Sequence, residues 1–165
     1  MENTKTMRRW LVAVGIFYLV MGIRLLPWIN GPMIESFGML DSVYTGGDIE
    51  IGTPAYAFLL DWMATFGATL IPLGAVLLVA SRDPIRNRLF AHLVIGHEIV
   101  AGILDDLWFI SRDYASDAFY LGFIVVHVTV IATGIRALRR TPRPTEQRSR
   151  GSDQRPERSS APTPA

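Results

Sequence analysis

The stretch that decides the fold is Leu89–Ile110, with the sequence LFAHLVIGHEIVAGILDDLWFI. It is mostly apolar and reaches the length of about 20 residues that crosses the hydrocarbon core of a bilayer. It also carries five ionisable side chains: His92, His97, Glu98, Asp105 and Asp106. Ionisable groups are costly inside a bilayer, so a spanning segment that keeps them must turn them toward protein or water. We therefore expect other helices to pack around this stretch.

Further apolar runs of similar length support that expectation. With the stretch above, which we extend to residues 85–110, they lie at about residues 10–29, 55–80 and 118–138. The pattern predicts an all-α, polytopic membrane protein, folded as an antiparallel bundle of four transmembrane helices within residues 1–139. The first run is too long for a signal peptide and lacks a cleavage site. Asn30, Gly31 and Pro32 are expected to end it, and Pro72 to kink the second run.

The charges in the gaps predict an orientation. Arg is frequent at the N-terminus, in residues 81–88 and in the tail, whereas residues 30–54 and 111–117 are acidic. By the positive-inside rule, this is a multi-pass protein of the cell membrane with its N- and C-termini in the cytoplasm. Trp28, Trp62 and Trp108 are then expected at the outer interface and Trp10 at the inner one, in contact with membrane lipids.

Two segments lie outside the apolar runs. Residues 30–54 are predicted to form a loop, and the alternation of residues 43–51 around Gly46-Gly47 indicates a hairpin within it. This loop is either a lid that contacts a ligand or a plain external connection. Residues 140–165 are rich in Arg, Pro and Ser and are predicted to form a disordered cytoplasmic tail. The tail either sets the topology or binds anionic lipids.

Ionisable residues from separate runs fall into two layers in this topology. Arg24, Asp61 and Asp105 form an outer layer with Asp106 at its margin, and His97, Glu98 and His127 form a deeper one. At about 100° per residue, Glu98 and Asp105 share a helix face, while His92 points elsewhere. These groups predict an outward-facing polar pocket that binds a ligand through Arg24, Asp61, His97, Glu98, Asp105 and His127.

Small residues next to Asp61 indicate how the second run packs. Asp61, Thr65, Ala68 and Pro72 form one stripe, which Ala57 and Ala75 extend. Small residues let membrane helices approach closely, so this stripe is expected to face the interior of the bundle. The pocket would then hold one permanent cation and up to four carboxylates. Either some carboxylates are protonated, or a cation, a metal or a cationic ligand neutralises them.

Other interpretations of the same residues remain open. In one, Arg24 would form a structural ion pair with Asp61 or Asp105 that fastens helices, and Asp105-Asp106 would be a solvated outer rim. In another, His97 and His127 would ligate a b-type haem. In a third, the two histidines would hold a divalent metal together with Glu98 and Asp105. No strong metal-ligand spacing supports the metal, so none is assigned. The chain has no Cys, which excludes disulfides, thiolate catalysis and Fe–S clusters. The cofactor is therefore left unassigned.

Three stretches together carry a resemblance to a known family. They are Gly96–Asp106, Tyr120–His127 with the following Thr133-Gly134, and Val14–Gly22. The chain resembles the BphX-like family of small bacterial integral membrane proteins over most of residues 7–140. The resemblance implies a small four-helix protein of the bacterial inner membrane whose molecular activity is not established. Glu98, Asp106 and His127 belong to the resembling pattern, whereas an apolar residue is expected at the position of His97.

The leading functional hypothesis is a non-enzymatic or accessory membrane protein. It binds, or helps to move, a small hydrophobic or cationic molecule in the pocket. Asp61, Glu98 and Asp105 would be the anionic or proton-exchanging groups, Arg24 their counter-ion and His127 a hydrogen-bonding floor. One alternative is a haem- or metal-dependent redox protein or enzyme, and the other is a structural or partner-binding subunit. A transporter with only four helices would have to form a homo-oligomer, and no nucleic-acid motif is present.

Overall fold

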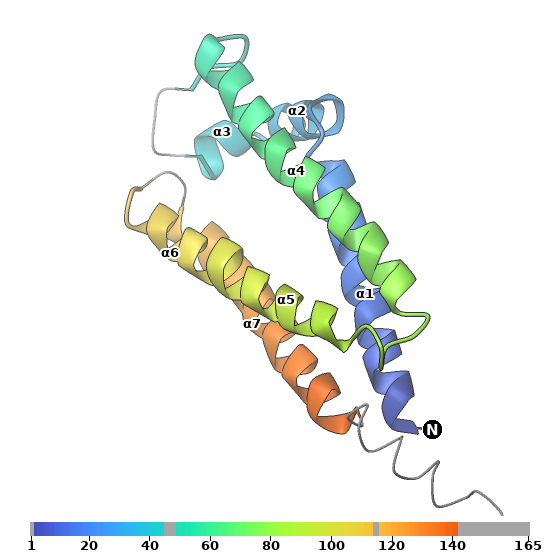
Figure 1. Cartoon of the computed structure of the whole chain (residues 1–165). Coiled ribbons are helices and arrows are strands. Elements are labelled where there is room, and N and C mark those ends of the chain that lie inside the picture. Colours follow the sequence, from blue (N-terminus) through green and yellow to red (C-terminus); the bar gives the residue numbers. More distant parts are fainter. Residues whose placement is uncertain (1, 45–48, 114–115, 142–165) are drawn as a thin grey trace, which may run out of the picture.

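The structure is a computed structural model, and it describes residues 2–44, 49–113 and 116–141. In chain order it contains α1 (Glu2–Arg24), α2 (Pro27–Ser36), α3 (Met39–Ser42), α4 (Pro54–Ala80), α5 (Arg88–Glu98), the π-helix η1 (Ile99–Leu104), α6 (Asp105–Ile110) and α7 (Asp117–Arg140) (Figure 1). No strand occurs among the described residues, so the all-α prediction is confirmed there. Within the same residues, α1, α4 and α7 are long and apolar enough to cross a membrane.

The predicted third helix is continuous but changes its hydrogen bonding midway. α5, η1 and α6 follow one another without a gap from Arg88 to Ile110. The middle portion is a π-helix, in which each backbone N–H reaches one residue further back than in an α-helix. One extra residue in a turn shifts the face on which all later side chains lie. This shift decides which carboxylates reach the interior, as described below.

The first helix ends earlier than expected, and Pro27 is the reason. α1 stops at Arg24, although an apolar run continues to about residue 29. A proline disfavours helical backbone in the residue before it, and Leu26 is extended with a ψ of 138°. Pro27 then occupies the first turn of α2, where its missing N–H leaves no hydrogen bond unmade. Pro32 lies inside α2, so the prediction that residues 30–32 end the first helix is wrong.

The predicted loop at residues 30–54 is partly helical and packed. It contains most of α2 and all of α3. The Tyr56 hydroxyl fastens α2 to α4, 3.3 Å from the Gly31 carbonyl oxygen and 3.0 Å from the Glu35 carboxylate. Ile34 and Tyr44 are buried against Tyr56 and Tyr120. The turn of the predicted hairpin, residues 45–48, lies outside the described residues, as does the predicted tail beyond residue 141.

Glycines bring α1 and α4 into backbone contact at two levels. A Cβ atom at Gly67 would lie 2.6 Å from the Gly22 carbonyl oxygen, and one at Gly74 would lie 2.7 Å from that of Gly15. The earlier glycine of α1 meets the later glycine of α4, so the two helices run in opposite directions. In each helix the two glycines are seven residues apart, which keeps them on one face. Figure 1 shows α1 and α4 lying side by side along most of their length.

α4 packs against α1 through the face that carries Gly67 and Gly74, and not through the face that the sequence predicted to be buried. The stripe of Ala57, Asp61, Thr65, Ala68, Pro72 and Ala75 is exposed along its whole length. Gly67 and Gly74 lie among larger apolar residues such as Leu70 and Leu77, but each glycine allows a closer backbone approach than the alanines of the stripe do. α1 therefore packs against Gly67 and Gly74, on the other side of the helix. The prediction that the stripe faces the interior is wrong.

A second helix pair consists of α7 and the α5–η1–α6 segment. Arg88 begins α5 and donates hydrogen bonds to the carbonyl oxygens of Leu138 and Thr141 at the end of α7, at 3.2 and 3.3 Å. Trp10 of α1 joins the two pairs. Its ring is buried against Gly134, and its Nε1 lies 3.1 Å from the Thr133 hydroxyl. Trp10 thus packs between helices, instead of lying on the outer surface as an interfacial anchor would.

Candidate functional site

A cavity of about 180 Å³ lies between the helices, in the half of the molecule covered by Tyr44. Its wall comes from α1, α4, α5, η1, α6 and α7, and nine of its lining residues are aromatic. An apolar cavity of about 150 Å³ engineered in another protein takes up benzene. The space is therefore adequate for a molecule of about one aromatic ring.

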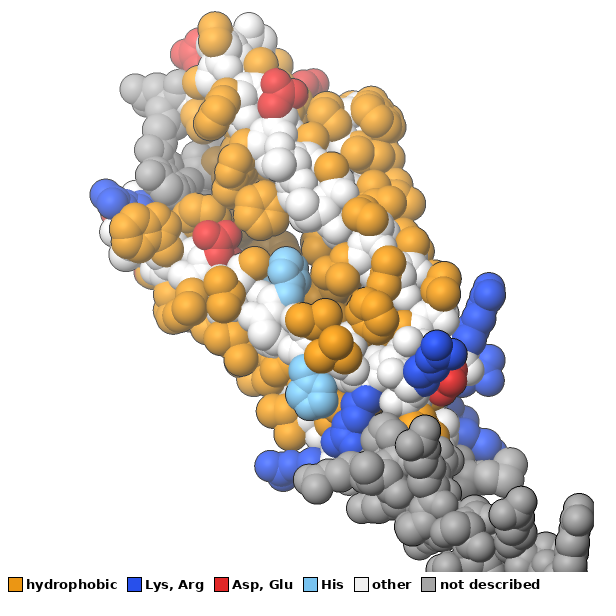
Figure 2. Space-filling view, in the orientation of Figure 1, with side chains coloured by type: hydrophobic (Ala, Val, Ile, Leu, Met, Phe, Trp, Pro, Cys, Tyr) orange, Lys and Arg blue, Asp and Glu red, His pale blue; other side chains and the backbone are white. Residues whose placement is uncertain are grey.

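The cavity lies where the two helix pairs separate. α4 packs against α1 and α2, whereas α5, η1 and α6 pack against α7. Figure 2 shows the surface hollowed between α4 and α5–α6, with an acidic side chain and a histidine at the edge of the hollow. Trp62 of α4 and Phe109 of α6 meet across this gap, with ring centroids 5.4 Å apart. Aromatic contact thus joins the pairs at one end of the opening.

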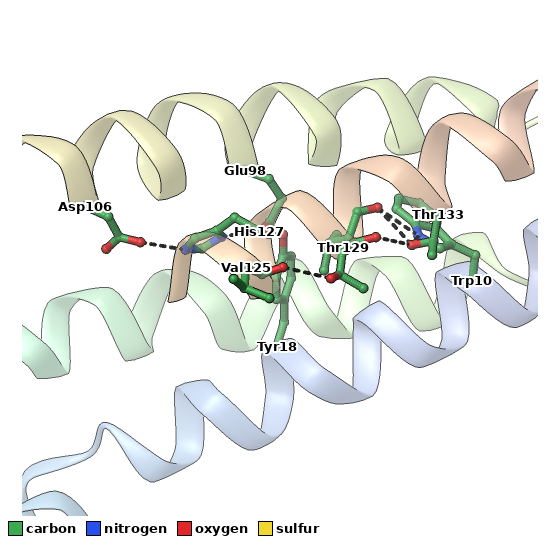
Figure 3. Close-up of polar contacts among 9 residues, drawn as sticks. Trp10, Tyr18, Glu98, Asp106, Val125, His127, Thr129 and Thr133 are labelled. Carbon is green, nitrogen blue, oxygen red and sulfur yellow. Dashed lines mark hydrogen bonds and ion pairs between the residues drawn. The ribbon is translucent and has the colours of Figure 1, made fainter. Parts of the chain in front are cut away.

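A chain of polar side chains crosses the interior beside the cavity (Figure 3). The Tyr18 hydroxyl donates a hydrogen bond to Oε1 of Glu98. The other oxygen of this carboxylate, Oε2, lies 2.5 Å from Nδ1 of His127. Nε2 of the same ring lies 3.4 Å from Oδ2 of Asp106. Glu98 is only 2% exposed, so this is a buried network with an imidazole ring between two carboxylates.

The π-helix and Gly102 create the position of the His127 ring. A Cβ atom at Gly102 would lie 2.5 Å from Nδ1 of His127, so the ring fits only because the side chain is absent. The extra residue in the turn places Asp106, eight positions after Glu98, on the His127 side. In an uninterrupted α-helix Asp105, seven positions after Glu98, would share that face. π-helical turns of this kind occur frequently at functional sites.

Five of the six residues predicted to bind a ligand line the cavity. They are Arg24, His97, Glu98, Asp105 and His127. Asp61 does not line it and is exposed on α4. In the part of the chain that the structure describes, the ion pairs are those of His127 with Glu98 and with Asp106. The predicted ion pair of Arg24 with Asp61 or Asp105 is therefore wrong. Asp106 is 8% exposed, so it lies deeper than the predicted solvated rim.

Residues 4–143 match the model of the family described as BphX-like. The chain belongs to the BphX-like family. It is similar to two proteins described as uncharacterized BphX-like proteins, from Burkholderia cepacia and from Paraburkholderia xenovorans (strain LB400). Each is 34% identical over 137 residues, which cover 82% of this chain and 92% of the relative. No solved structure matches this chain. The resemblance found in the sequence is thus confirmed, and the matched region includes the whole polar network.

Two residues of this BphX-like site were not found by sequence reasoning. Tyr18 shares a helix face with Leu11 and Val14 and is 2% exposed. A hydroxyl within an apolar helix needs a partner when it is buried, and that requirement pointed toward a polar group on another helix. Gly102 gave a weaker indication, because a glycine within a helix costs stability unless something approaches it closely.

The BphX-like site does not fit a haem or a metal ion, the two groups that the sequence analysis kept as possible ligands of His97 and His127. Both nitrogens of His127 face carboxylates, so neither is free to ligate a group in the cavity. The His97 ring packs edge-on against Tyr18, with centroids 6.1 Å apart. A cavity of one-ring size does not hold a porphyrin. Among the described residues, no three His, Asp or Glu side chains are grouped to hold a metal ion.

Tyr44 covers the cavity of the BphX-like fold from outside the long helices. Burial raises the pKa of its hydroxyl, although the nearby Arg24 guanidinium acts in the opposite direction. Its phenol therefore remains neutral at physiological pH. The residue also packs edge-on against Phe119, with ring centroids 5.9 Å apart, which continues the aromatic wall over the cavity.

Proposed function

We propose that this protein is a small, non-enzymatic integral membrane protein that binds, or helps to move, a small hydrophobic or cationic molecule. The observation that carries the proposal is the cavity itself. Its wall combines aromatic rings with the carboxylates of Glu98, Asp105 and Asp106. Ligand sites are mostly apolar concavities with a few convergent polar groups, and this cavity has that composition.

The proposed setting is the bacterial inner membrane, crossed by an antiparallel four-helix bundle. α1, α4 and α7 provide three spans, and the α5–η1–α6 segment, which buries Glu98 against His127 and Tyr18, provides the fourth. Large apolar side chains cover the outward faces, among them Val20, Val79, Val100 and Val125, each at least 58% exposed. Contiguous exposed apolar surface is rare on soluble monomers, and lipid tails would cover it here.

Charge supports an orientation with both termini in the cytoplasm. Figure 2 shows most of the visible Lys and Arg side chains gathered toward one end of the molecule, beside the start of α5 and the end of α7. The acidic residues Glu35, Asp41 and Glu50 belong to the segment that covers the other end. Cytoplasmic loops of membrane proteins carry the excess of Lys and Arg. The cavity would then lie toward the outer side.

A purely structural role explains the cavity less well. Toward the cytoplasmic end, the same helices bury Met7, Leu11, Leu77, Val94 and Ala137 to an exposure of 1% or less. Voids in a packed interior cost stability, since the lining atoms lose their contacts. The cavity half also retains a buried carboxylate oxygen without a hydrogen bond. A bound molecule would fill the void and could donate a hydrogen bond to this oxygen. A protein whose charges only hold helices together would need neither a void nor an oxygen without a hydrogen bond.

Native mass spectrometry of protein released from mild detergent tests the proposal. We expect the wild type to carry an organic adduct that Ala101→Trp removes, because Ala101 lines the cavity and an indole would fill it. The matched control is Ala132→Trp, which places the same ring on the exposed face of α7 and should leave the adduct in place.

Two results would overturn the proposal. One is a bare chain in both the wild type and Ala132→Trp. The other is an adduct that persists in Ala101→Trp, because the bound molecule would then be lipid on the outer surface.

A further inference from the structure

The charges around the cavity do not balance. Three carboxylates line it, those of Glu98, Asp105 and Asp106, against the guanidinium of Arg24 and the imidazoles of His97 and His127, which carry charge only when protonated. When every acid is ionised, the site is two positive charges short with both imidazoles neutral and one short with a single imidazole protonated. Uncompensated charge is costly in a low-dielectric interior, so a bound cation would stabilise this arrangement.

The two carboxylates of α6 are the least compensated of the three, because Asp105 takes part in no ion pair among the described residues and Asp106 in one long one. His127 is engaged by Glu98 through Nδ1 at 2.5 Å, whereas its Nε2 remains 3.4 Å from Asp106, beyond ordinary hydrogen-bond length. Asp106 is 8% exposed, and its buried Oδ2 has no hydrogen-bond donor. Both ion pairs of the described residues belong to His127, so Asp105 and Arg24 take part in none there. Among the described residues, no positively charged donor therefore lies within ordinary hydrogen-bond length of either α6 carboxylate.

The rest of the wall suits the apolar part of a small cation. Trp62, Phe66, Phe109 and Phe119 are among the aromatic residues that line the cavity. The face of an aromatic ring attracts a nearby cation, most strongly when the pair is removed from water. The volume of about 180 Å³ limits the ligand to roughly one ring with a short arm.

We infer that the cavity takes a primary ammonium ion carried on a group about the size of one aromatic ring. The N–H groups of the ammonium donate hydrogen bonds to Asp105 and Asp106, and its apolar body lies against the aromatic wall. This inference rests on the proposed function and narrows its ligand to one chemical class. Arg24, on the same wall, disfavours a second positive charge, so the ligand is a monocation.

The test measures binding of 2-phenylethylamine, protonated at pH 7, to the full-length protein in zwitterionic nanodiscs by isothermal titration calorimetry. 2-Phenylethanol serves as the neutral analogue and phenylacetate as the anionic one. We expect saturable binding of the amine that is at least 10-fold tighter than binding of the alcohol. Asp105→Asn and Asp106→Asn should each weaken amine binding about 10-fold, with little change for the alcohol. The matched control is Asp61→Asn, which removes an exposed carboxylate from α4 and should change affinity less than twofold.

Each of the other outcomes overturns the inference and indicates a different kind of cavity. Equal binding of amine and alcohol, unaffected by the two Asn variants, means a cavity for neutral molecules, and the proposed function survives. Phenylacetate binding that Arg24→Gln abolishes means an anion site. The absence of binding by all three probes rejects this ligand class, and the Ala101→Trp adduct experiment then decides the proposed function separately. If Asp106→Asn fails to fold, the half-exposed Asp105→Asn variant decides the outcome.

Discussion

The α1–α4 contact and the contact between η1 and α7 both depend on glycine, but they use it differently. At Gly22 and Gly67 the missing side chain lets one backbone touch the other. At Gly102 it leaves room for the imidazole of His127. The first contact closes a helix pair, and the second holds a polar ring between two carboxylates. The same residue type therefore builds a packed interface in one place and a polar one in the other.

The α1–α4 interface and the η1–α7 interface also have different surroundings, one a packed core and the other a cavity. The packed core around Met7, Leu11 and Leu77 adjoins the second of the two glycine contacts between α1 and α4. The polar interface adjoins the cavity and leaves Asp106 without a hydrogen bond. We therefore expect substitutions at the first interface to act mainly on stability and substitutions at the second to alter the polar network directly.

The largest expected effect is that of Glu98→Ala at the polar interface. This change leaves the Tyr18 hydroxyl and the His127 ring without their shared partner in a buried position. Removing one member of a buried ion pair typically costs about 3–5 kcal/mol. Chemical unfolding in detergent, followed by circular dichroism, should show a loss in this range.

The control for Glu98→Ala is Asp61→Ala, which truncates an exposed carboxylate and should change the free energy of unfolding by less than about 0.5 kcal/mol. Equal losses in the two variants would show that Glu98 has no buried partner. Tyr18→Phe combined with Glu98→Ala should cost less than the sum of the single changes, since the two residues share one contact.

A smaller loss is expected for Gly67→Ala at the packed interface. The new methyl group would lie 2.6 Å from the Gly22 carbonyl oxygen, and a backbone atom cannot turn away. Overpacking of this kind costs about 1–3 kcal/mol in the free energy of unfolding. The same unfolding measurement checks it.

Gly96→Ala is the matched control for the packed interface. Nothing lies within 4 Å of the Cβ position at Gly96, and alanine favours a helix over glycine by about 0.5–1 kcal/mol. We expect this variant to be as stable as the wild type or more so. A loss as large as that of Gly67→Ala would indicate a general helix effect and would remove the distinction between the two glycines.

The smallest change in stability is expected for Gly102→Ala, although it should alter the site most directly. Its methyl group would meet the His127 ring at 2.5 Å, and a ring can rotate away where a backbone carbonyl cannot. The gain in helix propensity and the weakened contact with Glu98 should nearly cancel, which leaves a net change of about 1 kcal/mol or less.

¹⁵N NMR of labelled histidine measures the effect of Gly102→Ala on the site. The His127 ring resonances should move toward those of a histidine without a carboxylate partner. Gly122→Ala, on the same helix as His127 and with nothing within 4 Å of its Cβ position, should leave them unchanged. Unshifted resonances in Gly102→Ala would contradict the view that this glycine positions the ring.

The sequence by itself determined the helical character and most of the candidate site. Long apolar runs form helices because backbone polar groups in such a run must bond to one another. Ionisable residues within those runs turn inward because exposure to an apolar environment is costly. That reasoning identified five cavity-lining residues without knowledge of the packing, namely Arg24, His97, Glu98, Asp105 and His127. The family was identified in a different way, from residue patterns such as that of Gly96–Asp106.

Only the tertiary structure decided which faces meet and which acid pairs with His127. Asp61 lies on a stripe of mostly small residues that the sequence predicted to be packed, but α1 packs against the face of Gly67 and Gly74, where the two backbones come into contact. Asp106 replaces Asp105 beside His127 because a π-helical turn adds a residue between Glu98 and the later acid. Both outcomes depend on contacts with another helix, and helical periodicity within one segment contains no information about those contacts.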